Sequence, residues 1–167
     1  MRETVQHWAA ETLPPPLAIL ICSALPILEL RGGIPLGHFL LGPERWLTIY
    51  LWAVLGNFLP VIPILKLLGP AERLLRRFRI FDRFFTWLFA RTERRSGPIR
   101  KYGTLGLILF VAIPAPMTGA WTGSMAAYLL KLPFKTSLLC VIMGILIAGA
   151  VMTLASLGVI GIAGLTG

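Results

Sequence analysis

Two long apolar blocks constrain the fold of this chain more than any other feature of its sequence. Residues 46–68 and 136–165 each hold the roughly 20 apolar residues that a helix needs to cross a bilayer. Of the 167 residues, 56% are hydrophobic and 14% are charged, whereas about a quarter are charged in an ordinary soluble domain. A soluble core of this size cannot cover that much apolar surface. The sequence therefore predicts an all-α integral membrane protein.

The formal charge of +9 is concentrated in one polar stretch. Ten of the sixteen Lys and Arg residues lie between Arg73 and Lys101. Basic residues near the ends of membrane spans stay on the cytoplasmic side, so we expect residues 69–103 to be cytoplasmic. The protein is then expected to be a multi-pass protein of the inner (cytoplasmic) membrane. This placement indicates membrane lipids as partners and argues against nucleic acid.

Residues 69–95 have the pattern of an amphipathic helix. Apolar residues follow 4,3,4,3 spacing, which is typical of one helical face; they are Leu74, Phe78, Phe81, Phe85 and Leu88. An arginine-rich flank beside such a face suits the headgroup region of an anionic leaflet. The candidate lipid-surface residues are Arg73, Arg76, Arg77, Arg79 and Arg83. The alternative is a helix that packs on its own protein, and the sequence leaves both open.

The single membrane domain, residues 1–167, is expected to contain two repeats. An interrupted apolar segment followed by a continuous one occurs in residues 17–68 and again in residues 104–165, with the basic linker 69–103 between them. Such internal symmetry is typical of transporters. We expect inverted-topology repeats, each a re-entrant helical hairpin (17–41 and 104–130) followed by a transmembrane helix. The alternative is four full spans, which would place Lys131 and Lys135 outside.

The first interrupted segment carries charges in an otherwise apolar stretch. Glu29 and Arg31 are followed by Gly32, Gly33 and Pro35, which disfavour a continuous helix. An ionised group at membrane depth costs several kcal/mol, so it normally faces a cavity, pairs with another charge, or binds a substrate or proton. We expect Arg31 to contact an anionic group and Glu29 to titrate as a proton-coupling group. The alternative is a buried pair that only fixes the fold.

The second interrupted segment combines helix breakers with hydroxyl groups and an indole N–H but has no charge. Its candidate residues are Pro114, Pro116, Thr118, Gly119, Trp121 and Thr122. Helix ends at such a break offer N–H groups and a partial positive charge, which suit a phosphate or carboxylate. If the two segments meet near the midplane, they form one substrate site. The alternative is that these residues only shape a turn.

Three further features are expected to be structural. Asn57, before Pro60, is expected at a kink of the first span, with lining of the cavity as the alternative. His38 is expected to pack in a hairpin arm, with a proton relay as the alternative. Small residues on one face of the last span are expected to let helices approach closely; they are Gly144, Ala148, Ala155 and Gly158.

Neither a cofactor, a metal site nor an enzymatic activity is expected. Cys22 and Cys140 lie in apolar blocks without metal-ligand spacing. The chain lacks the HExxH, GxSxG and P-loop motifs, and its single aspartate and two histidines offer no plausible catalytic dyad.

At its two motifs the chain resembles the small multidrug-export proteins of bacteria and archaea. The resemblance rests on the run Glu29 to Pro35 and on the later run Pro114 to Trp121. That family is similar to the DedA (SNARE-associated, VTT) proteins, which have paired re-entrant hairpins and include carriers of undecaprenyl phosphate and other lipids. The second DedA hairpin typically supplies an arginine, which is missing here. The residue-level resemblance therefore stops at Glu29 and Arg31.

The leading hypothesis is a transporter or lipid flippase for an amphipathic or anionic-headed molecule, such as a polyprenyl phosphate or a small drug. The alternative is a membrane scaffold or assembly factor that binds anionic lipid or a partner through the basic helix. With so few full spans, one copy can hardly enclose a path for a large solute, so we expect a homo-oligomer, with a dimer favoured.

Overall fold

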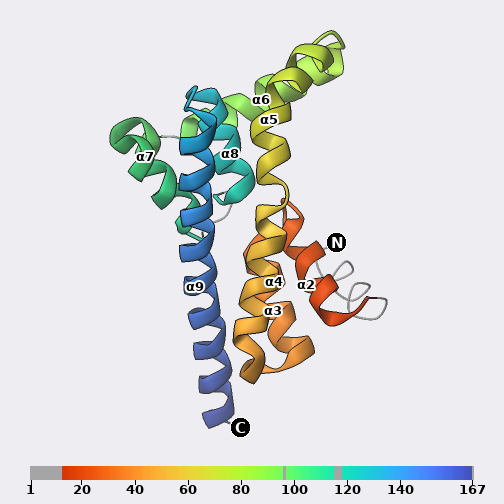
Figure 1. Cartoon of the computed structure of the whole chain (residues 1–167), viewed down its shortest axis with the longest axis vertical. Helices are drawn as coiled ribbons and strands as arrows, with labels where there is room; N and C mark the ends of the chain where they lie inside the picture. The colour runs from red at the N-terminus through yellow and green to blue at the C-terminus, as the bar shows by residue number, and fades with distance from the viewer. Residues whose placement is uncertain (1–12, 96, 115–117, 167) are drawn as a thin grey trace. The chain divides into compact units, whose positions relative to one another are not determined.

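The computed structural model describes residues 13–95, 97–114 and 118–166, and every regular element in these ranges is helical. The helices and their order are drawn in Figure 1. The chain divides into two compact units: unit 1 holds Met1–Leu59 and Ile145–Gly167, and unit 2 holds Pro60–Gly144. The expectation of an all-α chain is confirmed for the described residues.

Unit 1 is built on a helical hairpin packed against a third helix. Its elements are α2 (Pro15–Ala24), α3 (Glu29–Leu41), the short 3-10 helix η1 (Pro43–Arg45), α4 (Trp46–Phe58) and the second part of α9 (Phe134–Thr166). α2, α3 and α4 all contact one another. Glycines let the backbones approach closely, because a Cβ on Gly56 would lie 2.2 Å from the Leu20 carbonyl oxygen. A Cβ on Gly33 would lie 3.2 Å from the Ile19 carbonyl oxygen.

The interruption expected in residues 17–41 is present, but it lies ahead of the Gly-Pro motif. The chain turns between Ala24 and Glu29, and α3 then runs unbroken through Pro35 to Leu41. The expectation that the motif itself breaks the helix is wrong. Gly33 instead allows close helix packing, and Pro35 is exposed on the helix surface.

Unit 2 holds the basic region and the second interrupted segment. Its elements are α5 (Val61–Leu75), α6 (Arg79–Arg95), α7 (Gly97–Ala112), α8 (Ala120–Leu129) and the first part of α9. α8 contacts α5, α6 and α7. The expected interruption lies between Ala112 and Ala120, and Pro116 is outside the described residues. Gly123 packs against the Val111 side chain, where a Cβ would lie 2.3 Å from Cγ2.

Residues 69–95 form two helices, not the one amphipathic helix expected. α5 continues from the apolar block to Leu75, a turn closed by a hydrogen bond from Phe78 N to the Leu75 carbonyl follows, and α6 begins at Arg79. Of the expected apolar face, Phe85 is buried, whereas Leu74 and Phe78 are about 60% exposed (60% and 61%). The side chains of Phe81 and Leu88 are outside the described residues.

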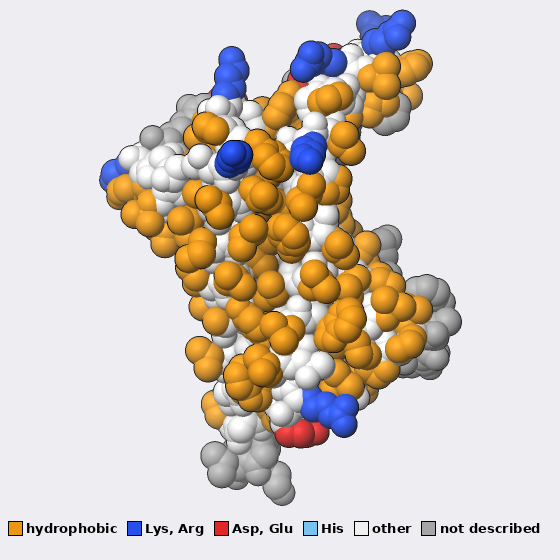
Figure 2. Space-filling view, in the orientation of Figure 1, with side chains coloured by type: hydrophobic (Ala, Val, Ile, Leu, Met, Phe, Trp, Pro, Cys, Tyr) orange, Lys and Arg blue, Asp and Glu red, His pale blue; other side chains and the backbone are white. Residues whose placement is uncertain are grey.

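Two stretches of the described chain are long and apolar enough to cross a membrane, Pro43–Leu75 and Phe134–Ile162. Only 28% and 39% of their most apolar windows are buried, whereas the core helix of a soluble protein is mostly buried. Figure 2 shows apolar side chains over most of the visible surface of each unit. Both spans expected from the sequence are thus present, and the first is interrupted at Leu59 and Pro60, between α4 and α5.

Candidate functional site

The first motif places an acid and a base at the start of α3. Glu29, the first residue of the helix, has a φ of 47°, which is uncommon for any residue other than glycine. Glu29 as a whole is only 5% exposed. One Arg31 nitrogen lies 3.8 Å from a Glu29 carboxylate oxygen, farther than a charge-assisted hydrogen bond of about 2.7–2.9 Å. The structure therefore brings this expected pair together, but in a loose geometry.

Other buried polar groups of unit 1 lie on the helices that pack against α3. Ser23 on α2 and Asn57 on α4 are at most 2% exposed. Neither Ser23 Oγ nor Asn57 Oδ1 has a hydrogen-bond partner among the described residues. Ser23 faces Gly33, because a Cβ there would lie 1.8 Å from the Ser23 hydroxyl oxygen. Asn57 lies about one turn before the break between α4 and α5, but its side-chain carbonyl oxygen makes no hydrogen bond to the backbone at that break.

The hydroxyl groups of the second motif are engaged by the turn itself. Thr118 donates a hydrogen bond of 2.6 Å to the Ile113 carbonyl, and Thr122 donates one of 3.5 Å to the Gly119 carbonyl. Gly119 has a φ of 141° directly before α8, a conformation that favours glycine. Trp121 and Thr122 are half-buried on the first turn of α8. These contacts favour the turn-shaping alternative for both threonines.

The two motifs belong to different units, Glu29 and Arg31 to unit 1 and Thr118 to Thr122 to unit 2. Their meeting at one site therefore stays a prediction.

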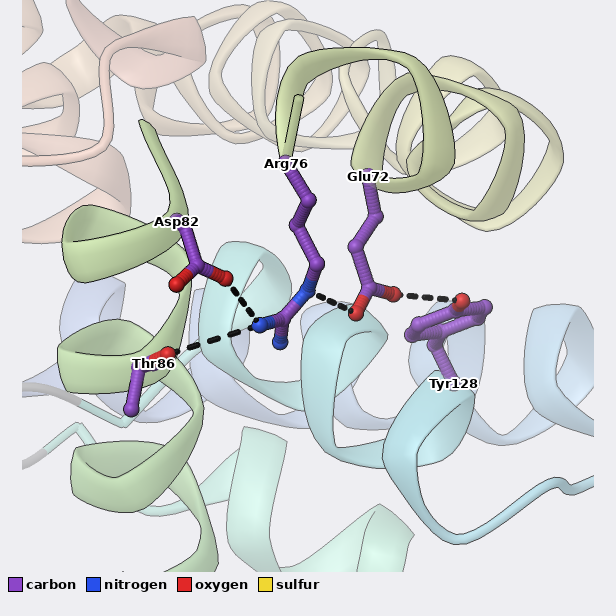
Figure 3. A network of polar contacts seen from close by, with 5 residues as sticks. All are labelled: Glu72, Arg76, Asp82, Thr86 and Tyr128. Atoms are coloured by element: carbon purple, nitrogen blue, oxygen red, sulfur yellow. Dashed lines mark hydrogen bonds and ion pairs between the residues drawn. The ribbon is translucent and has the colours of Figure 1, made fainter. Parts of the chain in front are cut away.

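A polar cluster in unit 2 connects α5, α6 and α8 (Figure 3). Arg76 Nε donates to Glu72 at 2.8 Å, and Arg76 Nη1 donates to Asp82 at 2.7 Å. A weaker contact of 3.4 Å joins Arg76 Nη1 to the Thr86 hydroxyl. The Tyr128 hydroxyl of α8 donates to the other Glu72 oxygen at 2.7 Å. We name these five residues the Arg76 cluster.

Aromatic contacts extend the Arg76 cluster. The Arg76 guanidinium lies 5.7 Å from the centre of the Phe89 ring, and Phe89 lies 6.2 Å from the Tyr128 ring. The hydrogen bonds to Glu72 and then to Asp82 raise the pKa of Arg76 above its ordinary value. The cluster therefore connects α6 to α5 and α8. This agrees with the alternative in which the basic helix packs on its own protein.

The expected lipid-surface arginines consequently fall into two groups. Arg76 is half-buried and engaged by two acids, and its expected role at the lipid surface stays a prediction. Arg73, Arg77, Arg79 and Arg83 are exposed. In unit 2, Lys and Arg side chains gather over α5 and α6 (Figure 2).

The small-residue face of α9 packs over only part of its length. A Cβ on Gly144 would lie 2.5 Å from Val111, and Ala148 is buried. Ala155 and Gly158 are exposed, and nothing lies within 4 Å of a Cβ on Gly158. His38 is buried, as expected of a packing residue, and Nδ1 lies 2.9 Å from the Ser156 hydroxyl.

Sequence reasoning did not find the Arg76 cluster, the contact of Ser23 with Gly33, or the contact of Ser156 with His38. One signal was present, because Glu72 and Arg76 are four residues apart on a helix, a spacing typical of ion pairs. Tyr128 and Ser156 gave none, since each meets a residue far away in the chain. Among the described residues, no group of three His, Cys, Asp or Glu side chains is placed to hold a metal ion.

Comparison with known proteins gives one family match. No curated protein and no solved structure matches it, so similarity to the DedA proteins stays a prediction. The family model described as "Putative small multi-drug export protein" matches residues 29–151, a range that begins at Glu29 and includes the turn between α7 and α8. Together with the two apolar spans, this match shows that the chain is a membrane protein and belongs to that small multi-drug export family.

Proposed function

We propose that this protein exports small amphipathic molecules, including ones with an anionic head, across the cytoplasmic membrane, and that Glu29 couples export to protons. The observation that carries the proposal is the position of Glu29, which is only 5% exposed at the start of α3 in an otherwise apolar segment. A carboxylate in an apolar segment is costly. A carboxylate in this position is understandable if it exchanges a proton or binds a ligand.

Three features of unit 1 support this assignment. Arg31 supplies a positive charge whose side chain is 26% exposed, so that an anionic group can reach it. Ser23 and Asn57 add buried oxygens on the neighbouring helices. Unsatisfied buried polar groups cost free energy, so they too favour a site that water or a polar ligand enters.

Transport into liposomes tests the proposal. Purified protein is reconstituted, a proton gradient is imposed, and the movement of ethidium and of a polyprenyl phosphate is followed. We expect movement of at least one of them, and we expect Glu29→Gln and Arg31→Gln to reduce it to the level of protein-free liposomes. The matched controls are Glu44→Gln and Arg45→Gln, which change the exposed charges of η1 in the same unit. Normal transport by Glu29→Gln would falsify the coupling role.

A second function is favoured by the exposed basic surface of α5 and α6. Leu74, Phe78 and Ile80 are 60%, 61% and 80% exposed, and they lie in sequence beside the four exposed arginines. Apolar side chains between basic ones suit insertion into an anionic headgroup layer. In this view the protein is a membrane scaffold, and the surface binds anionic lipid.

Lipid preference in nanodiscs separates the two functions. Under the scaffold function, replacing Arg73, Arg77, Arg79 and Arg83 by Gln abolishes the preference for phosphatidylglycerol over phosphatidylcholine, whereas Glu29→Gln has no effect. Arg76 stays unchanged in this variant, because its loss would disturb the fold of unit 2. If the fourfold variant keeps its lipid preference, the scaffold function is excluded.

A further inference from the structure

Unit 1 contains an apolar pocket between the end of α3 and the second part of α9. Its volume is about 660 Å³, and its walls include Pro35, His38 and Phe39 of α3 and Met152, Ala155 and Ser156 of α9. Pockets for small organic ligands measure about 300–1,000 Å³ and are mostly apolar with a few placed polar groups. This pocket has both properties.

The polar part of the wall is a fixed pair of side chains. His38 Nδ1 lies 2.9 Å from the Ser156 hydroxyl oxygen, so the two side chains are hydrogen-bonded to each other at this point of the wall. Ser156 is half-buried and retains hydrogen-bonding capacity beyond this contact. His38 is 5% exposed, and its Nε2 has no hydrogen-bond partner among the described residues. The wall thus offers hydrogen bonds at one point and apolar contacts elsewhere.

We infer that this pocket binds an uncharged molecule with an elongated apolar body and a single hydroxyl group, which bonds at the His38–Ser156 pair. No Lys, Arg, Asp or Glu contributes to the described lining. A carboxylate or an ammonium group would therefore enter without a counter-charge, and burying an unpaired charge is strongly unfavourable. The inference goes beyond the proposed function, because it concerns binding and holds whether or not Glu29 drives transport.

Photolabelling of the full-length protein in phosphatidylglycerol nanodiscs tests the inference. The probe is dodecanol with a diazirine in its chain, and dodecanoate with the same diazirine is the charged counterpart. We expect dodecanol adducts to concentrate on residues 35–43 and 152–160, with several-fold fewer from dodecanoate. Adducts spread evenly over the exposed face of α9, or equal labelling by both probes, would overturn the inference.

Two variants with the same added group make the test specific. Ala155→Trp places an indole in the pocket, and Leu154→Trp places one at the next residue, which is 71% exposed and outside the lining. We expect the first to abolish the adducts and the second to leave them unchanged. Ser156→Ala should lower labelling by dodecanol several-fold but not labelling by the corresponding diazirine alkane. Normal adducts in Ala155→Trp would contradict the inference.

Other occupants of the pocket give distinct results. A phospholipid chain would remain in native mass spectra and resist competition by dodecanol. A second copy of the chain would give a dimer that Ala155→Trp dissociates, without adducts in the wild type. Either result overturns the inference about the pocket. The proposed transport function is tested separately, by the liposome experiment.

Discussion

The α2–α3–α4 region of unit 1 and the α5–α6–α8 region of unit 2 each contain an acid–arginine pair, but the two pairs are built differently. In unit 1, Glu29 and Arg31 are 3.8 Å apart, and the helices are held by glycine contacts such as that of Gly56 with Leu20. In unit 2, Arg76 has two acids within 2.8 Å. Glycine packing therefore brings the helices of the first region close together, whereas hydrogen-bonded charges connect the helices of the second.

This difference indicates which charges are available for function. The charges of the Arg76 cluster satisfy one another, so they are needed where they lie. Glu29 is only 5% exposed and lies 3.8 Å from Arg31, and it is the charge that we propose for function. The native cysteines allow the two regions to be followed separately, because Cys22 is buried in unit 1 and Cys140 in unit 2.

The largest effect on stability is expected from Gly56→Ala. Its Cβ would lie 2.2 Å from a backbone oxygen of Leu20, which no side-chain rotation can relieve. Overpacking costs about 1–3 kcal/mol, and the helix propensity of alanine offsets roughly 0.5–1 kcal/mol of it. We expect a net loss of about 1–2 kcal/mol, measured in detergent as earlier labelling of Cys22 by a thiol-reactive dye on heating.

Gly158→Ala is the matched control for Gly56→Ala. It is also a helical glycine of unit 1, but nothing lies within 4 Å of its Cβ. We expect no loss of stability and a gain of up to about 1 kcal/mol. If the two variants behave alike, glycine packing does not hold the α2–α3–α4 region together.

A second effect, confined to unit 2, is expected from Glu72→Ala. The change removes the hydrogen bonds of Glu72 to Arg76 and Tyr128, and leaves Asp82 as the acid that Arg76 contacts in the cluster. We expect Cys140 to be labelled at a lower temperature and amide exchange of α6 to accelerate, while labelling of Cys22 stays as in the wild type. Arg79→Ala is the control, because Arg79 is an exposed charged residue on α6 outside the cluster. An equal shift at Cys22 would show that the two regions are not independent.

A smaller effect in the same region is expected from Tyr128→Phe. The variant keeps the ring against Phe89 and Gly69 but removes the 2.7 Å hydrogen bond to Glu72. A hydrogen bond of this kind contributes about 1 kcal/mol, which corresponds to roughly 2–4 °C in the unfolding temperature of a chain of this size. Tyr102→Phe, on an exposed tyrosine of α7, should leave that temperature unchanged. A null result for Tyr128→Phe would mean that α8 is held by its apolar contacts alone.

The sequence predicted the helical fold, both apolar spans and the presence of two interrupted segments, because apolar run length and proline position are local properties. It placed the first break wrongly inside the Gly-Pro motif, since glycine can serve either a turn or close helix packing, and only the neighbour of Gly33 decides between them. The Arg76 cluster escaped prediction because the pairing of Tyr128 with Glu72 spans 56 residues. The contact between Glu29 and Arg31 is local, and the sequence offered it as the alternative to a functional role for the two residues.

The smallest effect on stability is expected from Glu29→Gln, the variant with the largest expected effect on transport. The substitution keeps the shape of the side chain and removes a buried charge, and replacing a buried ion pair by a neutral group of similar volume is often nearly neutral for stability. We expect the unfolding temperature reported by Cys22 to change by no more than about 2 °C, equivalent to roughly 0.5 kcal/mol. A loss comparable to that of Gly56→Ala would instead make Glu29 part of the scaffold of unit 1. Its burial would then have the same explanation as that of Glu72, and the distinction between the two acid–arginine pairs would disappear.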